Sequence, residues 1–315
     1  HQNNLIAATS GRSFWILDDL NLIRQFKADT TVAKMYTPSS TMLASGYSEL
    51  DNNDASFSGA KSTTGVNPAT GMVLYYQLPN IPDSVELKLE IRNEAGQLIR
   101  SFSSKQDENY KSYDGGPRKE PTLTKSKGLN RFVWNLRHAT VTAIPNVYIE
   151  SSFNGHKAIP GKYTMRLIAG GNTVETIGTI LPNTNYTTTG SDYAQYDSVM
   201  RFMENTVTEM HQMVNQLKDN STHLEVLVKK LTTDATYNGV KYASLKQNAS
   251  ELVSKLKAWD EDMIQRKSTS YDDVENFPNK FTANYMFLMN QTESDIPQVN
   301  QPSLDLLKSY TAEWE

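Results

Sequence analysis

The sequence predicts a multidomain β-then-α protein: an immunoglobulin-like or fibronectin type III-like β-sandwich followed by an antiparallel helical bundle. As far as Leu181, apolar residues alternate with polar ones in short segments, the pattern of strands with one buried face. After Pro182 the apolar period changes to three and a half residues, the pattern of helices packed on helices. The 315 residues are too many for one ordinary domain and indicate two or three.

Composition excludes several classes of function. The chain has 31 basic and 35 acidic residues, a net charge of -4, which does not favour a nucleic-acid partner or an anionic membrane. It has no cysteine, which excludes thiol catalysis, disulfides and thiolate metal sites. Its apolar runs are far shorter than the roughly 20 residues that span a bilayer, so we expect no membrane insertion. The chain begins at His1 without an initiator Met or a signal peptide, so we expect a mature or excised piece of a longer protein.

Residues 1–28 contain two apolar, β-prone segments around a polar turn, as in a hairpin or in the closing strands of a larger sheet. The run Ser10-Gly-Arg-Ser-Phe-Trp-Ile-Leu-Asp-Asp-Leu20 resembles the segment that ends the β-propeller in large secreted bacterial proteins with BNR, or sortilin-like, repeats. In that family a linker, a β-sandwich and a helical tail follow the propeller, and the rest of this chain matches that order. The resemblance implies that residues 5–17 are the last propeller strands and that the protein is exported. The alternative is an ordinary edge hairpin of the next domain.

Residues 29–65 are rich in Thr, Ser, Asn, Asp and Gly, which predicts a linker or a long surface excursion. Within them, Asp51-Asn-Asn-Asp54 offers oxygen atoms of the kind that bind calcium. Its spacing matches no EF-hand loop, so a solvated turn is the simpler interpretation.

Residues 66–182 contain the strands of the predicted sandwich, and Trp134 is the expected core anchor. The expected strands are 71–78, 85–91, 97–102, 128–137, 159–167 and 173–181. A loop is expected over 105–127. The phrase Gly128-x-Asn-x-Phe-x-Trp134, followed by Pro160-Gly-x-Tyr163, also resembles the FlgD-like immunoglobulin module of bacterial exported proteins.

Residues 183–315 are expected to form a bundle of three to four helices. An apolar seam predicts one long helix from about Asp192 to Thr232, although Asp219-Asn-Ser-Thr222 resembles a helix stop followed by a new cap. After a turn at Asn238-Gly239, a second helix is expected over 245–263, antiparallel to the first, and shorter helices over 281–289 and 302–314.

No set of residues has the spacing of a catalytic, cofactor or metal site. The histidines His1, His138, His156, His211 and His223 lie in no metal motif, and exposed helical histidines are the simpler account. The paired carboxylates, which glycoside hydrolysis needs, are Asp18-Asp19 and Asp260-Glu261-Asp262. Adjacent strand residues point to opposite faces, so Asp18 and Asp19 cannot flank one glycosidic bond.

The expected function is that of a non-catalytic accessory region. It would cap or position its own N-terminal propeller, bind a protein or glycan ligand, or both. The alternative is part of a glycoside hydrolase whose active site lies in a propeller outside this chain, and a third possibility is a self-standing adhesion or assembly module. An outward-facing Tyr75 or Tyr76 would favour glycan binding, whereas a bare apolar patch beside Phe14 and Trp15 would favour docking to a propeller.

Overall fold

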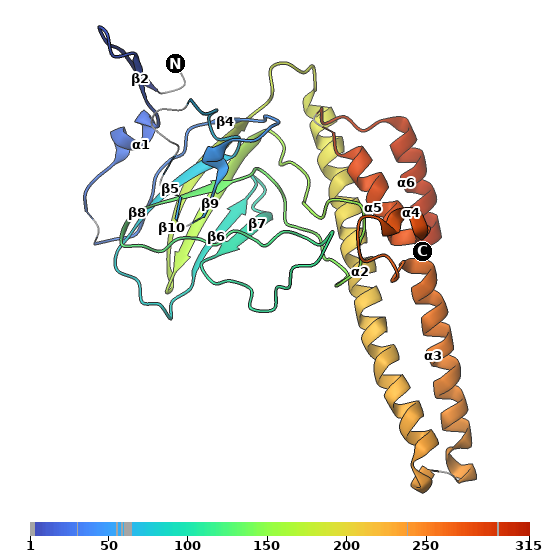
Figure 1. Cartoon of the computed structure of the whole chain (residues 1–315). Helices are drawn as coiled ribbons and strands as arrows, with labels where there is room; N and C mark the ends of the chain where they lie inside the picture. The colour runs from blue at the N-terminus through green and yellow to red at the C-terminus, as the bar shows by residue number, and fades with distance from the viewer. Residues whose placement is uncertain are drawn as a thin grey trace. The chain divides into compact units, whose positions relative to one another are not determined.

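A computed structural model describes residues 4–29, 31–54, 56, 57, 59, 65–237, 239–294 and 296–315 (Figure 1). The chain divides into two compact units that alternate along the sequence. Unit 1 comprises residues 1–110, 119–139 and 156–194, and unit 2 comprises residues 111–118, 140–155 and 195–315.

The strands lie in unit 1 and form three sheets. They are β1 (Leu5–Ala8), β2 (Phe14–Leu17), β3 (Lys34–Met35), β4 (Thr41–Met42), β5 (Met72–Leu78), β6 (Leu87–Arg92), β7 (Leu98–Ser103), β8 (Gly128–Trp134), β9 (Gly161–Ala169) and β10 (Asn172–Leu181). The largest sheet has the order β4-β10-β9-β6-β7 and a second has the order β3-β5-β8. Within the part of the chain that the structure describes, β1 pairs only with β2. Helix α1 (Leu20–Gln25) and a short 3-10 helix, η1 (Glu49–Asp51), join them.

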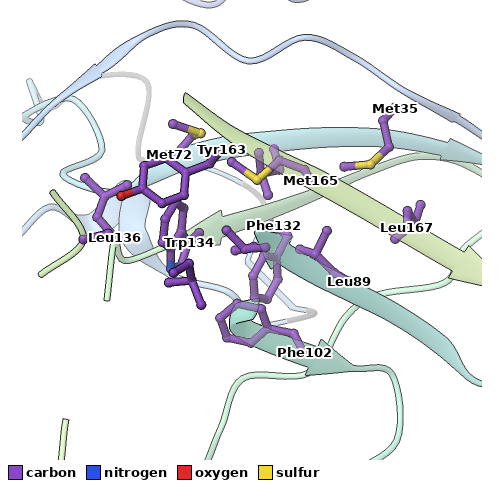
Figure 2. Packing of buried hydrophobic residues seen from close by; sticks show 14 of the residues in the cluster. Met35, Met72, Leu89, Phe102, Phe132, Trp134, Leu136, Tyr163, Met165 and Leu167 are labelled. Carbon is purple, nitrogen blue, oxygen red and sulfur yellow. The ribbon is translucent and has the colours of Figure 1, made fainter. Parts of the chain in front are cut away.

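One hydrophobic cluster is shared by the two larger sheets (Figure 2). Alternate residues of each strand enter it, as the period of two requires: Leu87, Leu89 and Ile91 of β6 are all 0% exposed. Trp134 at the end of β8 is also 0% exposed, and its ring meets Tyr163 edge-on with the centroids 5.4 Å apart. The expectation that Trp134 anchors this core is confirmed.

The predicted fold class, an immunoglobulin-like sandwich followed by an antiparallel helical bundle, was wrong. The six strands expected between residues 71 and 181 are present, but the largest sheet is mixed, because β4 runs parallel to β10 with Thr41 opposite Ile180. Both β3 and β4 come from residues 29–65, where the pattern indicated no strand. Alternation identifies the buried face of a strand, but it does not say which strands pair, and a two-residue strand has no period to detect.

The helices lie largely in unit 2. They are α2 (Gly190–Thr233), α3 (Ala243–Met263), α4 (Asp273–Asn276), α5 (Phe281–Thr292) and α6 (Gln301–Trp314), with short 3-10 turns η2 (Ala235–Tyr237) and η3 (Val240–Tyr242) between α2 and α3. The uninterrupted helix expected through 219–222 is confirmed, because α2 runs for 44 residues. A turn was expected at residues 238–239, and Asn238 lies outside the described residues.

The helices do not form the expected bundle, although α3, α5 and α6 have close to the expected lengths. Helix α3 has 21 residues, and α5 and α6 have 12 and 14. The shorter helices lie beside one part of α2, and the remainder of α2 runs alongside α3 as a two-helix arm (Figure 1).

Candidate docking surface

The hairpin formed by β1 and β2 exposes large apolar side chains on the surface of unit 1. The strands are antiparallel, with Leu5 opposite Leu17 and Ala8 opposite Phe14. The turn closes where the backbone N–H of Thr9 donates to the Ser13 carbonyl at 3.2 Å, and Gly11 supplies a left-handed conformation with φ of +78°. Of the two arrangements expected for the segments around Ser10-Gly-Arg, a hairpin and the closing strands of a larger sheet, the structure has the hairpin.

Both faces of the hairpin are apolar and exposed. Directly opposed residues of an antiparallel pair share a face, so Trp15 lies with Leu5 and Leu17 on one face, and Phe14 lies with Ile6 and Ile16 on the other. Phe14 is 76% exposed and Trp15 is 59% exposed. A strand that is apolar on both faces is typical of sheets that are covered on both sides.

The segment after the hairpin is anchored to the body of unit 1. Asp19, the residue before α1, accepts a hydrogen bond from the Tyr75 hydroxyl at 2.7 Å. In α1, the Asn21 side chain donates to the Thr37 carbonyl at 2.7 Å, and the ring of Phe26 stacks on Tyr36. The hairpin therefore leaves the unit from a fixed attachment point, while its own apolar side chains contact solvent.

Neither tyrosine that would have favoured glycan binding is part of an outward row. Tyr76 is 0% exposed and its hydroxyl donates to the Thr124 carbonyl at 2.6 Å, and burial raises its pKa to about 12. Tyr75 is partly exposed and is held by Asp19. Burial raises the pKa of Tyr75, and the hydrogen bond to Asp19 raises it further by a smaller amount.

The candidate carboxylates take part in structural contacts. Asp19 holds Tyr75, as described, and Asp260 forms a two-pronged ion pair with Arg266 at 2.5 and 2.6 Å. Glu261 and Asp262 are exposed on the surface of α3.

The segment 51–54 is an ordered turn that supports the neighbouring strands. The Asp51 carboxylate accepts hydrogen bonds from the backbone N–H and the hydroxyl of Thr70 at 2.8 and 2.7 Å. The Asn53 side chain pairs with the backbone of Val133 through two bonds of 2.8 and 2.7 Å, as an added strand residue would. Two of the side chains considered for calcium thus have structural partners: Asp51 holds the residue Thr70 ahead of β5, and Asn53 pairs with β8.

The histidines are mostly buried, so the expectation of exposed helical histidines holds for His223 and fails for His211. His138 and His156 belong to unit 1, where their rings stack with centroids 3.8 Å apart, which the sequence did not indicate. His211 is 0% exposed within unit 2, and its Nδ1 lies 2.7 Å from the Thr142 carbonyl. His1 lies outside the described residues.

Comparisons with protein-family models, with curated proteins and with solved structures found no match to this chain. Across the described ranges, no helix combines the length and the apolar character needed to cross a membrane. The geometry of the hairpin is therefore the main guide to function.

Proposed function

We propose that this chain is a non-catalytic accessory region of an exported bacterial protein, and that it docks onto a β-propeller through the hairpin β1–β2. The observation that supports this proposal is the exposure of apolar side chains on both faces of the hairpin, including Trp15 on one and Phe14 on the other. The resemblance of the run from Ser10 to Leu20 to the end of a propeller suggests the partner.

A propeller blade offers contacts of the required kind. Blades are four-stranded sheets set radially around a channel, so a blade packs against a neighbour on each of its two faces. In the described residues β1 and β2 pair only with each other, so their outer edges remain able to pair with further strands. A two-stranded hairpin is marginally stable on its own, and insertion into a blade would bury both faces and at least one edge.

The alternative functions have less support. Glycan binding would need tyrosines that point outward, but Tyr76 is buried and the Tyr75 hydroxyl donates a hydrogen bond to Asp19. A role as part of a glycoside hydrolase would use the same docking contact and would place the reaction in the propeller. No observation on the carboxylates favours chemistry in this chain, because Asp19 and Asp260 hold structural partners.

Mixing the chain with the propeller region of its parent protein is expected to give a stable complex, measurable by isothermal titration calorimetry. Trp15→Ser and Phe14→Ser should each weaken the complex at least tenfold. Burying a large apolar side chain contributes about 1.5–3 kcal/mol, and about 1.4 kcal/mol corresponds to a factor of ten in affinity.

Ile177→Ser is the matched control, because Ile177 is a 55% exposed strand residue of unit 1 outside the hairpin. It should leave the affinity unchanged. If the chain and the propeller region do not associate at micromolar concentration, the proposal is wrong. An effect of only one hairpin substitution would exclude placement inside a blade, where both faces are covered.

A further inference from the structure

The hairpin β1–β2 joins the body of unit 1 through a link of two residues. Asp18 and Asp19 form the whole link, because β2 ends immediately before them and α1 begins immediately after them. Helix α1 is itself held in place, since the Asn21 side chain donates to the Thr37 carbonyl at 2.7 Å. Each residue has only two soft backbone angles, so the conformations of these two residues set the direction in which the hairpin leaves the unit.

Asp19 has a backbone conformation that few side chains favour. Its φ of 56° and ψ of 39° lie in the left-handed region, where a residue with a Cβ atom is strained. An aspartate before a helix ordinarily lies in the extended region, and its carboxylate caps the first N–H groups. The structure describes every residue of α1, and the Asp19 carboxylate makes no capping hydrogen bond to them. The link therefore combines a strained conformation with the lack of a helix cap.

The carboxylate of Asp19 is directed at Tyr75 instead. The Tyr75 hydroxyl donates to Oδ2 of Asp19 at 2.7 Å. Tyr75 belongs to β5, the central strand of the sheet β3-β5-β8, and it lies directly opposite Arg131 of β8. The Arg131 guanidinium in turn donates to the Asn52 carbonyl at 3.3 Å. One end of the Tyr75–Asp19 hydrogen bond thus belongs to a sheet of the core, and the other end belongs to the link.

We propose that the hydrogen bond from Tyr75 to Asp19 is a conformational lock, which fixes the direction of the hairpin relative to the body of unit 1. Strain at a single residue persists only where surrounding contacts determine its conformation, and this hydrogen bond is such a contact. Without it, Asp19 would relax into the extended or right-handed region, and the hairpin would turn about the link.

The consequence of the lock for docking rests on the proposed function. A hairpin held in a propeller blade would carry unit 1 with it, and the lock would give unit 1 one direction relative to the propeller. A hairpin with a fixed direction also loses less conformational freedom when it binds. The lock itself is a property of the isolated chain, so it can be tested without the propeller.

Double electron–electron resonance between two spin labels measures the direction of the hairpin in the full chain. The chain has no cysteine, so labels attach only where cysteine is introduced, by Ser10→Cys in the hairpin turn and Ser101→Cys at an exposed position of β7. We expect one narrow distribution of distances. Tyr75→Phe removes the donor and Asp19→Ala removes the acceptor, so each should widen the distribution by about twofold or more as the link gains backbone freedom.

Two further variants should leave the distribution narrow. Asp19→Asn is the conservative variant, because its amide oxygen can accept from the Tyr75 hydroxyl and asparagine tolerates the left-handed region. Asp18→Ala is the matched control for Asp19→Ala, because Asp18 is an exposed carboxylate in the same link.

Urea unfolding of the same variants separates a lock from a hydrogen bond that only stabilises unit 1. A lower midpoint for Tyr75→Phe with an unchanged distance distribution would assign the bond to stability alone and would overturn the proposal. A wide distribution without any substitution at the link, or equal widening by Asp18→Ala, would overturn it as well. If Tyr75→Phe widens the distribution but the chain does not associate with the propeller region, the lock is supported and the proposed function is wrong.

Discussion

Trp134→Ala is expected to lower the free energy of unfolding of unit 1 by about 3–5 kcal/mol, the usual cost of truncating a buried tryptophan. The indole is 0% exposed, packs against Tyr163 and donates from Nε1 to the Arg137 carbonyl at 3.0 Å. Removal therefore leaves a cavity inside the cluster shared by the two larger sheets, and it leaves a carbonyl without its donor (Figure 2).

Urea unfolding followed by near-ultraviolet circular dichroism measures this effect. Trp15→Ala is the matched control, because Trp15 is 59% exposed in the isolated chain and should change the midpoint little. Equal midpoints for the two variants would show that Trp134 is not the core anchor.

Acid is expected to destabilise unit 2 through His211. Burial, partly offset by the bond to the Thr142 carbonyl, lowers the pKa of His211 to about 4, below its ordinary value of 6.5. Between those values the unfolded chain binds a proton that the folded chain does not, so stability present above pH 6.5 is lost as the pH falls toward 4. The loss through this one group is about 3 kcal/mol, at about 1.4 kcal/mol for each unit of pKa.

The variant His211→Asn isolates this contribution. A carbonyl can only accept, so Nδ1 of His211 carries the proton, and the asparagine amide can donate in its place without titrating. Urea unfolding at 222 nm between pH 7 and pH 4 should show a smaller loss of stability in this variant than in the wild type. His223→Asn, at an exposed position of the same helix, should follow the wild type, and a matching profile for His211→Asn would contradict the assignment.

Individual strands and helices were predictable because the residue pattern that identifies each one lies within its own segment of the chain. The alternation around Trp134 identified β8 and its buried face, and the apolar seam identified α2 through the cap-like Asp219-Asn-Ser-Thr222. The hairpin was predictable for the same reason, since two apolar segments flank a Ser-Gly-Arg turn. For β8 and α2 the period of the apolar residues carries the information.

Long-range arrangements were not predictable in this way. The parallel pairing of β4 with β10 joins residues near position 41 to residues near position 180, and no period spans that distance. The burial of His211 has a similar cause. It lies outside the seam of α2, and it is covered by segment 140–155, whose Thr142 accepts its hydrogen bond and whose Phe153 lies with its ring centroid 6.2 Å away.

The docking surface was predictable in part. The residues of the hairpin were identified from sequence, but alternation could not show that both faces would remain uncovered, because exposure depends on what the rest of the chain does.

Amide hydrogen exchange of the chain, alone and mixed with the propeller region of its parent protein, tests the docking proposal most directly. The account predicts fast exchange at the outer backbone N–H groups of β1 and β2 in the isolated chain, and strong protection of residues 5–8 and 14–17 in the mixture. The core strand β8 should exchange at the same rate in both samples. Unchanged exchange in both hairpin strands at a propeller concentration above micromolar would contradict the account.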